Sequence, residues 1–404
     1  MRNRRNRLIA TVAAGLLVTS AAACSSSGKS SGGGSSSGDI VIGLDCDTTG
    51  PGASYATPSC NATKDTIDLI NSKGGVGGRK LRYVEGNDES DPTKTPTVLQ
   101  KLVSQGAKAL ILLTSSAGAL QAKSLIERTG IPVLMPVASN PLVTQPPNNT
   151  YLYELAETTA DWAKLLCGAF QAKGITSLGF LQDSSPSEVQ FNQGFLKALT
   201  CVKVDVQSAP IDATDLSAEV ARIKSSNPGA VMVGTSSINF EILAQNTFFQ
   251  QLPSTPRFTE ATLGGVPSAW AQAQKGALNG VVGFSAITST NPNTKSVEDF
   301  FKTKQGASFK LTQFWAQAYD GVQLLAKAFE QAGSTDGTKV NAALQSISKH
   351  PASFGYPGFT LSFSADKHQG ADGICGEVLV TWGADNQLTG PWSGYQPDCT
   401  ATTS

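Results

Sequence analysis

The chain has 404 residues with a formal net charge of zero at pH 7, and only 15% of its residues are charged. Without the four arginines of residues 1–7, 27 basic and 31 acidic residues remain, a net charge of about −4. Such a chain offers no basic surface for nucleic acid, which we exclude as a partner. Its length exceeds that of a typical single hydrophobic core, so we expect two domains.

The first 23 residues have the three parts of a secretory signal peptide. Four arginines in residues 1–7 are followed by an apolar run over 8–18, and small residues lead through 21–23 to Cys24. The apolar run is shorter than the roughly 20 residues that a membrane-spanning helix needs. A signal that ends at a cysteine looks like a lipobox, so we expect cleavage before Cys24 and a lipid on its side chain. Ordinary cleavage, with Cys24 incidental, is the alternative.

Residues 25–38 consist almost entirely of serine and glycine. Such a composition cannot bury a hydrophobic core and behaves as a flexible coil. We therefore interpret residues 24–38 as a tether. It would join a lipid anchor in the cell membrane to a folded body outside the cytoplasm.

From residue 40 onward, short apolar and often β-branched runs alternate with amphipathic stretches of helical period. Gly174 and Asp215 stand where they would cap two of the helices. Alternation of strands and helices predicts an α/β fold, in which parallel sheets carry helices on both faces. The expected strands are 40–44, 80–85, 109–113, 133–135, 177–181, 202–206, 230–233 and 281–284. The expected helices are 61–71, 95–104, 117–128, 159–173, 188–199, 216–225, 238–249 and 313–332.

The chain contains seven cysteines, and a lipid on Cys24 accounts for the odd one. In an exported protein the other six should form disulfides rather than bind a metal. Six cysteines allow fifteen pairings, but the six cysteines form three couples whose members are close in sequence. We predict the disulfides Cys46–Cys60, Cys167–Cys201 and Cys375–Cys399. We expect no metal site, since C-x-x-C is absent and His350 and His368 are far apart in sequence.

Loops that follow the strands are the candidate site, because ligands of parallel α/β sheets bind beyond the carboxyl ends of the strands. Ser115 and Ser116 lie where one such loop opens into a helix. Hydroxyl and N–H groups at a helix N-terminus can hold an anion such as a carboxylate. The alternative is that these hydroxyls only cap helices, but several polar loops at one sheet end favour a site. The loops are 45–55, 114–119, 136–140, 182–187 and 234–239.

In the expected folded body, residues 39–404, none of the catalytic motifs G-x-S-x-G, H-E-x-x-H, the P-loop and G-x-G-x-x-G is present. The Gly-rich segment 74–80 follows a helix and precedes a strand, which is the reverse of a phosphate-binding loop and predicts a helix C-cap and turn. A pair of carboxylates can form a hydrolase site without a sequence signature, and this alternative stays open. A binding protein without a cofactor is the preferred class.

A series of motifs runs along the body of the chain: 49–55 (TGPGASY), 69–71 (LIN), 74–80 (GGVGGRK), 87–92 (NDESDP), 114–118 (TSSAG), 130–133 (GIPV), 138–141 (ASNP), 221–224 (ARIK) and 227–228 (NP). Together they are very similar to the branched-chain amino-acid (Leu/Ile/Val) binding proteins, the type I periplasmic binding proteins of ABC importers. The resemblance covers essentially the whole body and is most specific over about the first 110 residues.

The resemblance implies two α/β lobes, joined by three crossovers, that close on a solute. Lobe one would comprise 39–157 and 289–372, and lobe two 158–288 and 373–404. Each predicted disulfide then lies within one lobe, as a working hinge requires. The resemblance further implies ABC permease subunits in the membrane as partners, and we expect a monomer.

By position, the resemblance implies that Ser116 and Ser139 hold a solute carboxylate, beside Ser115. Backbone groups of Val137 would help, and Tyr55 would line the pocket. The second lobe departs from the family, because the loop 183–187 lacks the usual aromatic side chain, as does 235–237, which contains Ser236.

These departures bear on the ligand. A buried ammonium group without a carboxylate partner costs several kcal/mol. An α-amino acid therefore requires Asp183 or Glu260 to face it. If neither does, the solute is a carboxylate without an amine, or a polar neutral compound.

The sequence thus predicts a lipid-anchored receptor outside the cytoplasm that delivers a small carboxylate-bearing solute, an amino acid or a related compound, to an ABC import permease. One alternative is a ligand-sensing component of a membrane signalling system. The other is an exported hydrolase that uses carboxylates.

Overall fold

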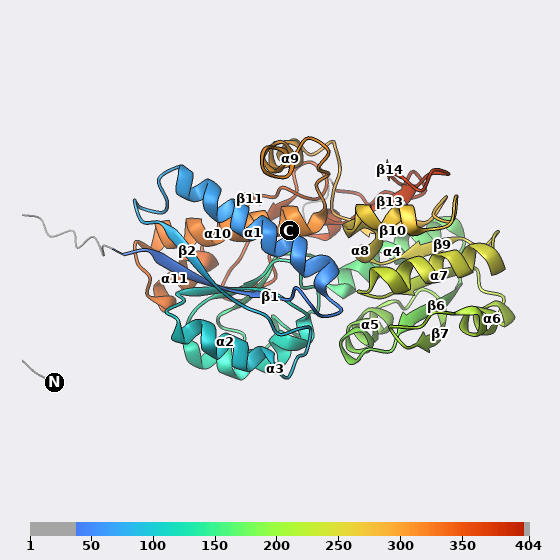
Figure 1. Ribbon diagram of the computed structural model, residues 1–404, viewed down its shortest axis with the longest axis horizontal. Coiled ribbons are helices and arrows are strands. Elements are labelled where there is room, and N and C mark those ends of the chain that lie inside the picture. The colour runs from blue at the N-terminus through green and yellow to red at the C-terminus, as the bar shows by residue number, and fades with distance from the viewer. Residues whose placement is uncertain (1–37, 400–404) are drawn as a thin grey trace, which may run out of the picture. The chain divides into compact units, whose positions relative to one another are not determined.

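The computed structural model describes residues 38–399 (Figure 1). The expected signal peptide, the lipid site Cys24 and all of the expected tether except Gly38 lie outside the described residues. Within the described part of the chain, no helix combines the length and the apolar character needed to cross a membrane.

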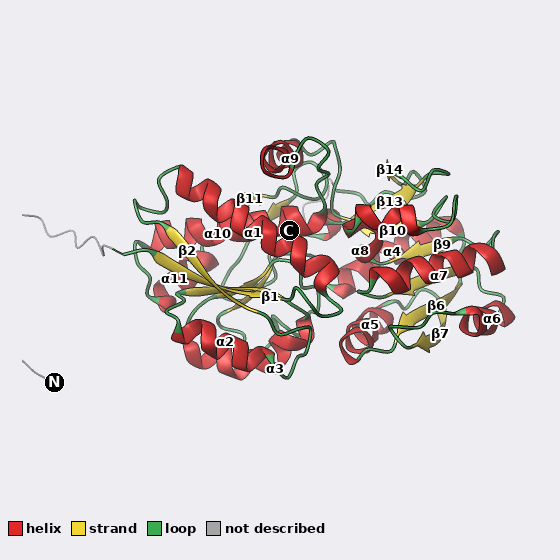
Figure 2. Ribbon diagram, in the orientation of Figure 1, coloured by secondary structure: helices red, strands yellow, loops and turns green. Residues whose placement is uncertain are grey.

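The first sheet contains five parallel strands in the order β2-β1-β3-β4-β5. Helices cover both of its faces (Figure 2). Alternate residues of β3 show why: Ile111 and Leu113 join the core with α1 and α10, whereas Leu110 and Leu112 pack with α2 and α3. The strands are β1 Ile40–Cys46, β2 Leu81–Gly86, β3 Ala109–Leu113, β4 Val133–Met135 and β5 Leu152–Glu154. The helices are α1 Ala53–Ser72, α2 Thr95–Ser104, α3 Ser116–Thr129, α10 Gln313–Ala332 and α11 Gly337–Gln345.

The second sheet contains seven strands in the order β14-β13-β10-β9-β8-β6-β7. Its faces are again divided, since Phe180 packs with α4 and α5 while Leu181 packs with α6 and α7. The strands are β6 Ser177–Asp183, β7 Lys203–Ala209, β8 Ala230–Gly234, β9 Arg257–Thr259, β10 Val282–Ser285, β13 Val378–Trp382 and β14 Leu388–Pro391. The helices are α4 Thr159–Lys173, α5 Pro186–Ala198, α6 Ser217–Ser225, α7 Ile238–Gln251, α8 Ala261–Gly265 and the 3₁₀ helix η1 Pro267–Gln272.

Smaller elements complete the described part of the chain. Helix α9 Pro292–Gln305 follows β10, and β11 His350–Pro351 pairs antiparallel with β12 Thr360–Leu361. The 3₁₀ helix η2 Ile374–Gly376 precedes β13.

All eight expected strands and all eight expected helices are present, with differences at their ends. The largest difference is at the start of α1, which begins at Ala53 rather than at residue 61 and contains Pro58. Gly174 ends α4 in the left-handed conformation, as predicted. Asp215 accepts a 2.8 Å hydrogen bond from the backbone N–H of Ser217, and α6 begins at this residue, one position later than expected.

The expected alternation of strands and helices does not extend to the C-terminal end, where β13 and β14 follow each other without a helix between them. Strand β13 pairs antiparallel with β10, and β14 pairs antiparallel with β13. Two strands joined by a short turn run antiparallel because a parallel pair needs a long crossover. The sequence reading also missed β5, β9, α8, α9 and α11.

The three predicted disulfides are confirmed. Cys46–Cys60 joins β1 to α1, Cys167–Cys201 joins α4 to the turn before β7, and Cys375–Cys399 joins η2 to the C-terminal segment. The Gly-rich turn is confirmed as well, since Gly74, Gly75, Gly77 and Gly78 have positive φ angles between α1 and β2.

Candidate functional site

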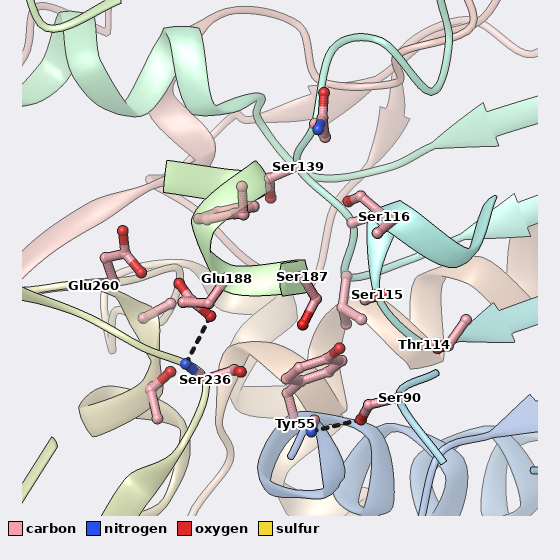
Figure 3. A pocket seen from close by; sticks show the side chains of 18 of the residues that line it. Tyr55, Ser90, Thr114, Ser115, Ser116, Ser139, Ser187, Glu188, Ser236 and Glu260 are labelled. Carbon is pink, nitrogen blue, oxygen red and sulfur yellow. Dashed lines mark hydrogen bonds between the residues drawn. The ribbon is translucent and has the colours of Figure 1, made fainter. Parts of the chain in front are cut away.

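A cavity of about 110 Å³ opens where the loops after strands of both sheets meet (Figure 3). Its walls come from the loops after β2, β3, β4, β8 and β9, from α1, α4 and α5, and from the starts of α3, α8 and α10. The lining residues are Gly52, Tyr55, Ser90, Thr114, Ser115, Ser116, Ala117, Val137, Ala138, Ser139, Asn140, Trp162, Ser187, Glu188, Gln190, Phe191, Thr235, Ser236, Glu260, Ala261, Thr262 and Phe314.

Hydroxyl groups line the side of the cavity that faces the first sheet (Figure 3). Ser115 is the N-cap of α3, and its hydroxyl accepts a 3.4 Å hydrogen bond from the backbone N–H of Gly118. Capping therefore accounts for Ser115. Ser116 and Ser139 are 9% and 3% exposed, and among the described residues neither hydroxyl has a hydrogen-bond partner. These two hydroxyls are free to bind a ligand.

Tyr55 stands in the first turn of α1, and its ring lies 6.0 Å from that of Phe314. The backbone N–H of Gly52 donates a 2.8 Å hydrogen bond to Ser90, whose hydroxyl donates to Asp47. These bonds hold the start of α1 against the loop after β2. A Cβ atom at position 52 would lie 2.6 Å from the Tyr55 hydroxyl, so glycine leaves room for this ring. Burial and then the charge of Asp47 raise the pKa of Tyr55 well above its usual value, and its hydroxyl stays protonated.

The opposite side of the cavity carries two carboxyl groups (Figure 3). Glu188 is the third residue of α5, and Glu260 directly follows β9. One oxygen of Glu188, Oε2, accepts a 2.9 Å hydrogen bond from the backbone N–H of Ser236. Burial and then the charge of Asp183 raise the pKa of Glu188 to about 7. Burial and then the charge of Glu188 raise the pKa of Glu260 well above its usual value.

Apolar side chains form the remaining walls. Trp162 stacks on Phe284 with ring centroids 5.0 Å apart, and it meets Phe191 edge-on at 5.9 Å. Phe314 and Val137 add further apolar surface. The cavity therefore has a hydroxyl pole, an acidic pole and an aromatic wall between them, which is the usual composition of a small-molecule site.

Asp183 does not lie among the lining residues, contrary to our expectation that it could face a solute. Its Oδ1 accepts a 2.9 Å hydrogen bond from the backbone N–H of Ser185, and its Oδ2 accepts one of 2.5 Å from the Thr235 hydroxyl. The Asp183 carboxylate is thus used to join the loops after β6 and β8. Thr235 in turn accepts a 3.0 Å hydrogen bond from the N–H of Ser237.

The structure brings together seven of the eight residues expected to bind a ligand. They are Tyr55, Ser115, Ser116, Val137, Ser139, Ser236 and Glu260. The sequence reading missed Glu188, which it placed only as the start of an amphipathic helix, and the aromatic residues Trp162, Phe191 and Phe314. The one available signal for Glu188 was its position directly after the polar loop 182–187.

The fold is that of a two-lobed type I periplasmic binding protein. The structure is similar to the type 1 periplasmic binding protein of Bordetella pertussis Tohama I, with a TM-score of 0.75 at 19% identity over 88% of this chain and 100% of that one. It is also similar to LivJ of Streptococcus pneumoniae, a branched-chain amino acid transporter substrate-binding protein in complex with isoleucine (TM-score 0.74, 19% identity, 87% and 98% coverage). A Rhodopseudomonas palustris ABC transporter solute-binding protein in complex with benzoate has a TM-score of 0.71 at 19% identity, with 88% and 96% coverage.

The chain belongs to the periplasmic binding protein family, whose model matches residues 39–375. It is 24% identical to the Leu/Ile/Val-binding protein homolog 1 of Brucella suis biovar 1 over 374 residues, which cover 86% of this chain and 92% of the relative. An amino acid binding protein of Pseudomonas aeruginosa is likewise 24% identical, over 78% of this chain and 83% of its own length. The resemblance inferred from the sequence motifs is confirmed.

Proposed function

We propose that this protein is an extracytoplasmic receptor that captures a small carboxylate-bearing solute, an amino acid or a related compound, and delivers it to an ABC import permease. The observation that carries the proposal is the cavity between the strand ends of two sheets, with free hydroxyls at one pole and carboxyls at the other. The names of the relatives, amino-acid and Leu/Ile/Val-binding proteins, support the same class of ligand. We take lobe one as 39–157 and 289–372, and lobe two as 158–288 and 373–404.

The hydroxyl pole is suited to a carboxylate. Ser116 is the first residue of α3, where backbone N–H groups have no partner within the helix and the helix dipole favours negative charge. The Ser139 hydroxyl lines the same cavity and has no hydrogen-bond partner among the described residues. A carboxylate placed here would accept hydrogen bonds from both hydroxyls and from the start of α3.

A thermal-shift screen of the purified protein against amino acids, carboxylates and amides tests the proposal. A bound solute at a hundredfold excess over Kd should stabilise the protein by about 2.7 kcal/mol. The Ser139→Ala variant should lose this shift and keep the melting temperature of the unliganded protein. Ser104→Ala is the matched control, since this exposed hydroxyl bonds only within α2. If no compound shifts the melting temperature, the receptor function is wrong.

The lipid anchor on Cys24 is proposed from the sequence motif. Metabolic labelling with a radioactive fatty acid should label the wild-type protein and not Cys24→Ser. The same variant should leave the membrane fraction. A wild-type protein that takes up no label would contradict the anchor.

Two alternatives have their own tests. Loss of solute uptake on deletion of the gene separates an importer receptor from a sensory component. The Glu188–Glu260 pair meets the minimum requirement of a carboxylate-dependent hydrolase, but the relatives are named as binding proteins. Mass spectrometry of a bound solute after prolonged incubation should recover it unchanged, whereas a hydrolase would return its fragments.

A further inference from the structure

Two buried carboxyl groups lie outside the cavity, at passages of the chain between the two sheets. Glu157 stands between β5 of the first sheet and α4, which packs on the second sheet. Glu377 stands directly before β13 of the second sheet, after a segment whose Phe363 and Ala371 belong to the core of the first sheet. Such connections are where a hinge between two lobes absorbs its motion.

Both carboxyl groups lack a hydrogen-bond donor. Glu157 and Glu377 are 0% and 1% exposed, and none of their four carboxyl oxygens has a hydrogen-bond partner among the described residues. A Cβ atom at Gly376 would lie 1.9 Å from Oε1 of Glu157, so the Glu157 carboxyl lies against the residue before Glu377. Buried polar atoms are nearly always satisfied, so four neighbouring acceptors without a donor indicate that the carboxyls carry protons of their own.

The surroundings of the pair favour these protons. Burial and then the charge of Glu377 raise the pKa of Glu157 well above its usual value, and burial raises the pKa of Glu377 to about 8. The further acidic neighbour of Glu157 is Asp161 on α4, whose carboxylate accepts hydrogen bonds from the N–H and the hydroxyl of Thr158 at 3.0 and 2.7 Å. The elements η2 and β13 carry no charged residue. Since a carboxylic acid both donates and accepts, two protons make the pair self-complementary.

Trp162 connects the pair to the cavity. Its indole N–H faces the carboxyl of Glu377 and has no hydrogen-bond partner among the described residues, while its ring belongs to the aromatic wall. The backbone N–H of Thr159, two positions after Glu157, donates a 2.6 Å hydrogen bond to the carbonyl of Ser139 at the hydroxyl pole. A displacement of the pair would therefore reach two walls of the cavity.

We propose that Glu157 and Glu377 form a pair of hydrogen-bonded carboxylic acids that positions Trp162 at the cavity, so that protons control solute capture. When the O–H bond of Glu377 breaks, its proton passes to water and a carboxylate remains buried beside Glu157. A buried charge without a partner is costly, so the ionised pair separates and admits water. The effect on capture rests on the proposed receptor function, whereas the positioning of Trp162 does not.

The direction of the pH dependence follows from where the proton is held more tightly. With the pair closed, Glu377 keeps its proton up to about pH 8, and water at an opened pair returns its pKa toward 4.5. Closure therefore takes up a proton between these limits. Kd should rise with pH in this range, by at most about tenfold for each unit, and stay constant above about pH 8. Glu188 and Glu260 in the cavity also titrate, so a variant must isolate the contribution of the pair.

Tryptophan fluorescence of the purified protein, titrated from about pH 5 to about pH 9, tests the positioning without a solute. We expect a transition near pH 8 that Trp162→Phe abolishes, although four of the five tryptophans remain. Glu377→Gln should abolish it as well, because glutamine donates and accepts at every pH. Gly376→Ala is the second variant, since its Cβ would displace the Glu157 carboxyl, and it should move the transition to lower pH.

Two controls accompany this titration. Glu188→Gln, which removes a titrating carboxyl from the cavity, should keep the transition near pH 8. Glu330→Gln, at an exposed position of α10, should also keep it.

The effect on capture is tested by repeating the thermal-shift screen of amino acids, carboxylates and amides at about pH 6 and about pH 8. Calorimetry then gives the Kd of each compound that binds. Between the two pH values the Kd of the wild type should rise about tenfold more than that of Glu377→Gln. Glu330→Gln should follow the wild type.

The inference is overturned if the wild type shows no transition, if the transition survives in Glu377→Gln, or if Glu188→Gln abolishes it. A transition that a metal chelator shifts would overturn it too, because a bound cation would then satisfy the carboxyls. Equal pH dependence of Kd in the wild type and Glu377→Gln would overturn the control of capture. If no compound binds at either pH, the receptor function is wrong, and the fluorescence still decides whether the pair positions Trp162.

Discussion

The hydroxyl of Ser54 donates a 2.7 Å hydrogen bond to the backbone carbonyl of Ser236, so the first turn of α1 is attached to the loop after β8. The N–H of the same Ser236 donates to Glu188 at 2.9 Å. One residue thus connects a helix of the first sheet to the acidic pole on the second. Through these two hydrogen bonds, Ser236 contacts residues on both sides of the cavity.

Ser54→Ala should weaken solute binding. A hydrogen bond of this kind contributes about 1 kcal/mol, so Kd should rise by roughly fivefold if the bond forms only when the cavity closes. Titration calorimetry measures the change. Ser72→Ala on the same helix is the control, because its exposed hydroxyl bonds only to Leu69 of α1. Equal affinities of the two variants would show that the Ser54 contact does not depend on the solute.

Asp183→Ala should destabilise the protein although Asp183 does not line the cavity. The change leaves the Thr235 hydroxyl and the Ser185 N–H without their acceptor, at a cost of about 2–3 kcal/mol. Urea denaturation measures the loss. Asp215→Ala removes an exposed acceptor before α6 and should cost less than about 1 kcal/mol. A fully stable Asp183→Ala protein with lost binding would instead place Asp183 in contact with the solute.

Glu377 should make the free energy of unfolding depend on pH. It is buried just before β13, and burial raises its pKa from 4.5 to about 8. The folded protein therefore holds this proton more tightly than the unfolded chain does. The free energy of unfolding should fall as the pH rises from about 4.5 to about 8, by at most about 1.4 kcal/mol per pH unit from this one group. Above about pH 8 its contribution should be constant.

Glu377→Gln should remove the contribution of Glu377 to the fall in the free energy of unfolding between about pH 4.5 and about pH 8. Urea denaturation at several pH values measures this dependence. Glu330→Gln, at an exposed position of α10, should keep the wild-type slope. Identical slopes in both variants would mean that Glu377 is as easily ionised in the folded protein as in the unfolded chain.

Removal of the Cys167–Cys201 disulfide by a double substitution to alanine should lower the free energy of unfolding. The closed loop spans 34 positions, for which chain entropy predicts a loss of about 3–4 kcal/mol. Chemical denaturation measures it. The Cys46–Cys60 disulfide closes a shorter loop of 14 positions, so its removal by a double substitution to alanine should cost slightly less. A larger loss for the shorter loop would mean that packing of the sulfur atoms, rather than chain entropy, dominates.

Much of the fold could be predicted because its signals are local. The strand at 109–113 is an unbroken apolar run, and the helix at 313–332 carries apolar residues at helical spacing. The strands β5 and β9 have three residues each and contain the charged residues Glu154 and Arg257, whereas the equally short β4 is wholly apolar and was predicted. They are strands because neighbouring strands supply their hydrogen-bond partners: β5 pairs with β4, and β9 pairs with β8 and β10. The start of α1 was hidden by Pro58, which ordinarily argues against a helix interior.

The site was predictable as a set of loops and not as an arrangement of side chains. Asp183 and Glu188 are five positions apart, and both are acidic residues near the end of β6. Hydrogen bonds to Ser185 and Thr235 hold the first away from the cavity. The first turn of α5 carries the second into it. Only the packing of the loops decides that Glu188, and not Asp183, lines the cavity.

The sequence by itself determined the α/β alternation, the disulfide pairs and the polar loops at the strand ends, because these depend on neighbours along the chain. The tertiary structure decided which side chains share the cavity. Ser139, Glu188 and Phe314 are far apart in sequence and meet only when both sheets and α10 are packed. The charge state of the acidic pole was decided in the same way, since burial, and not residue type, raises the pKa values of Glu188 and Glu260.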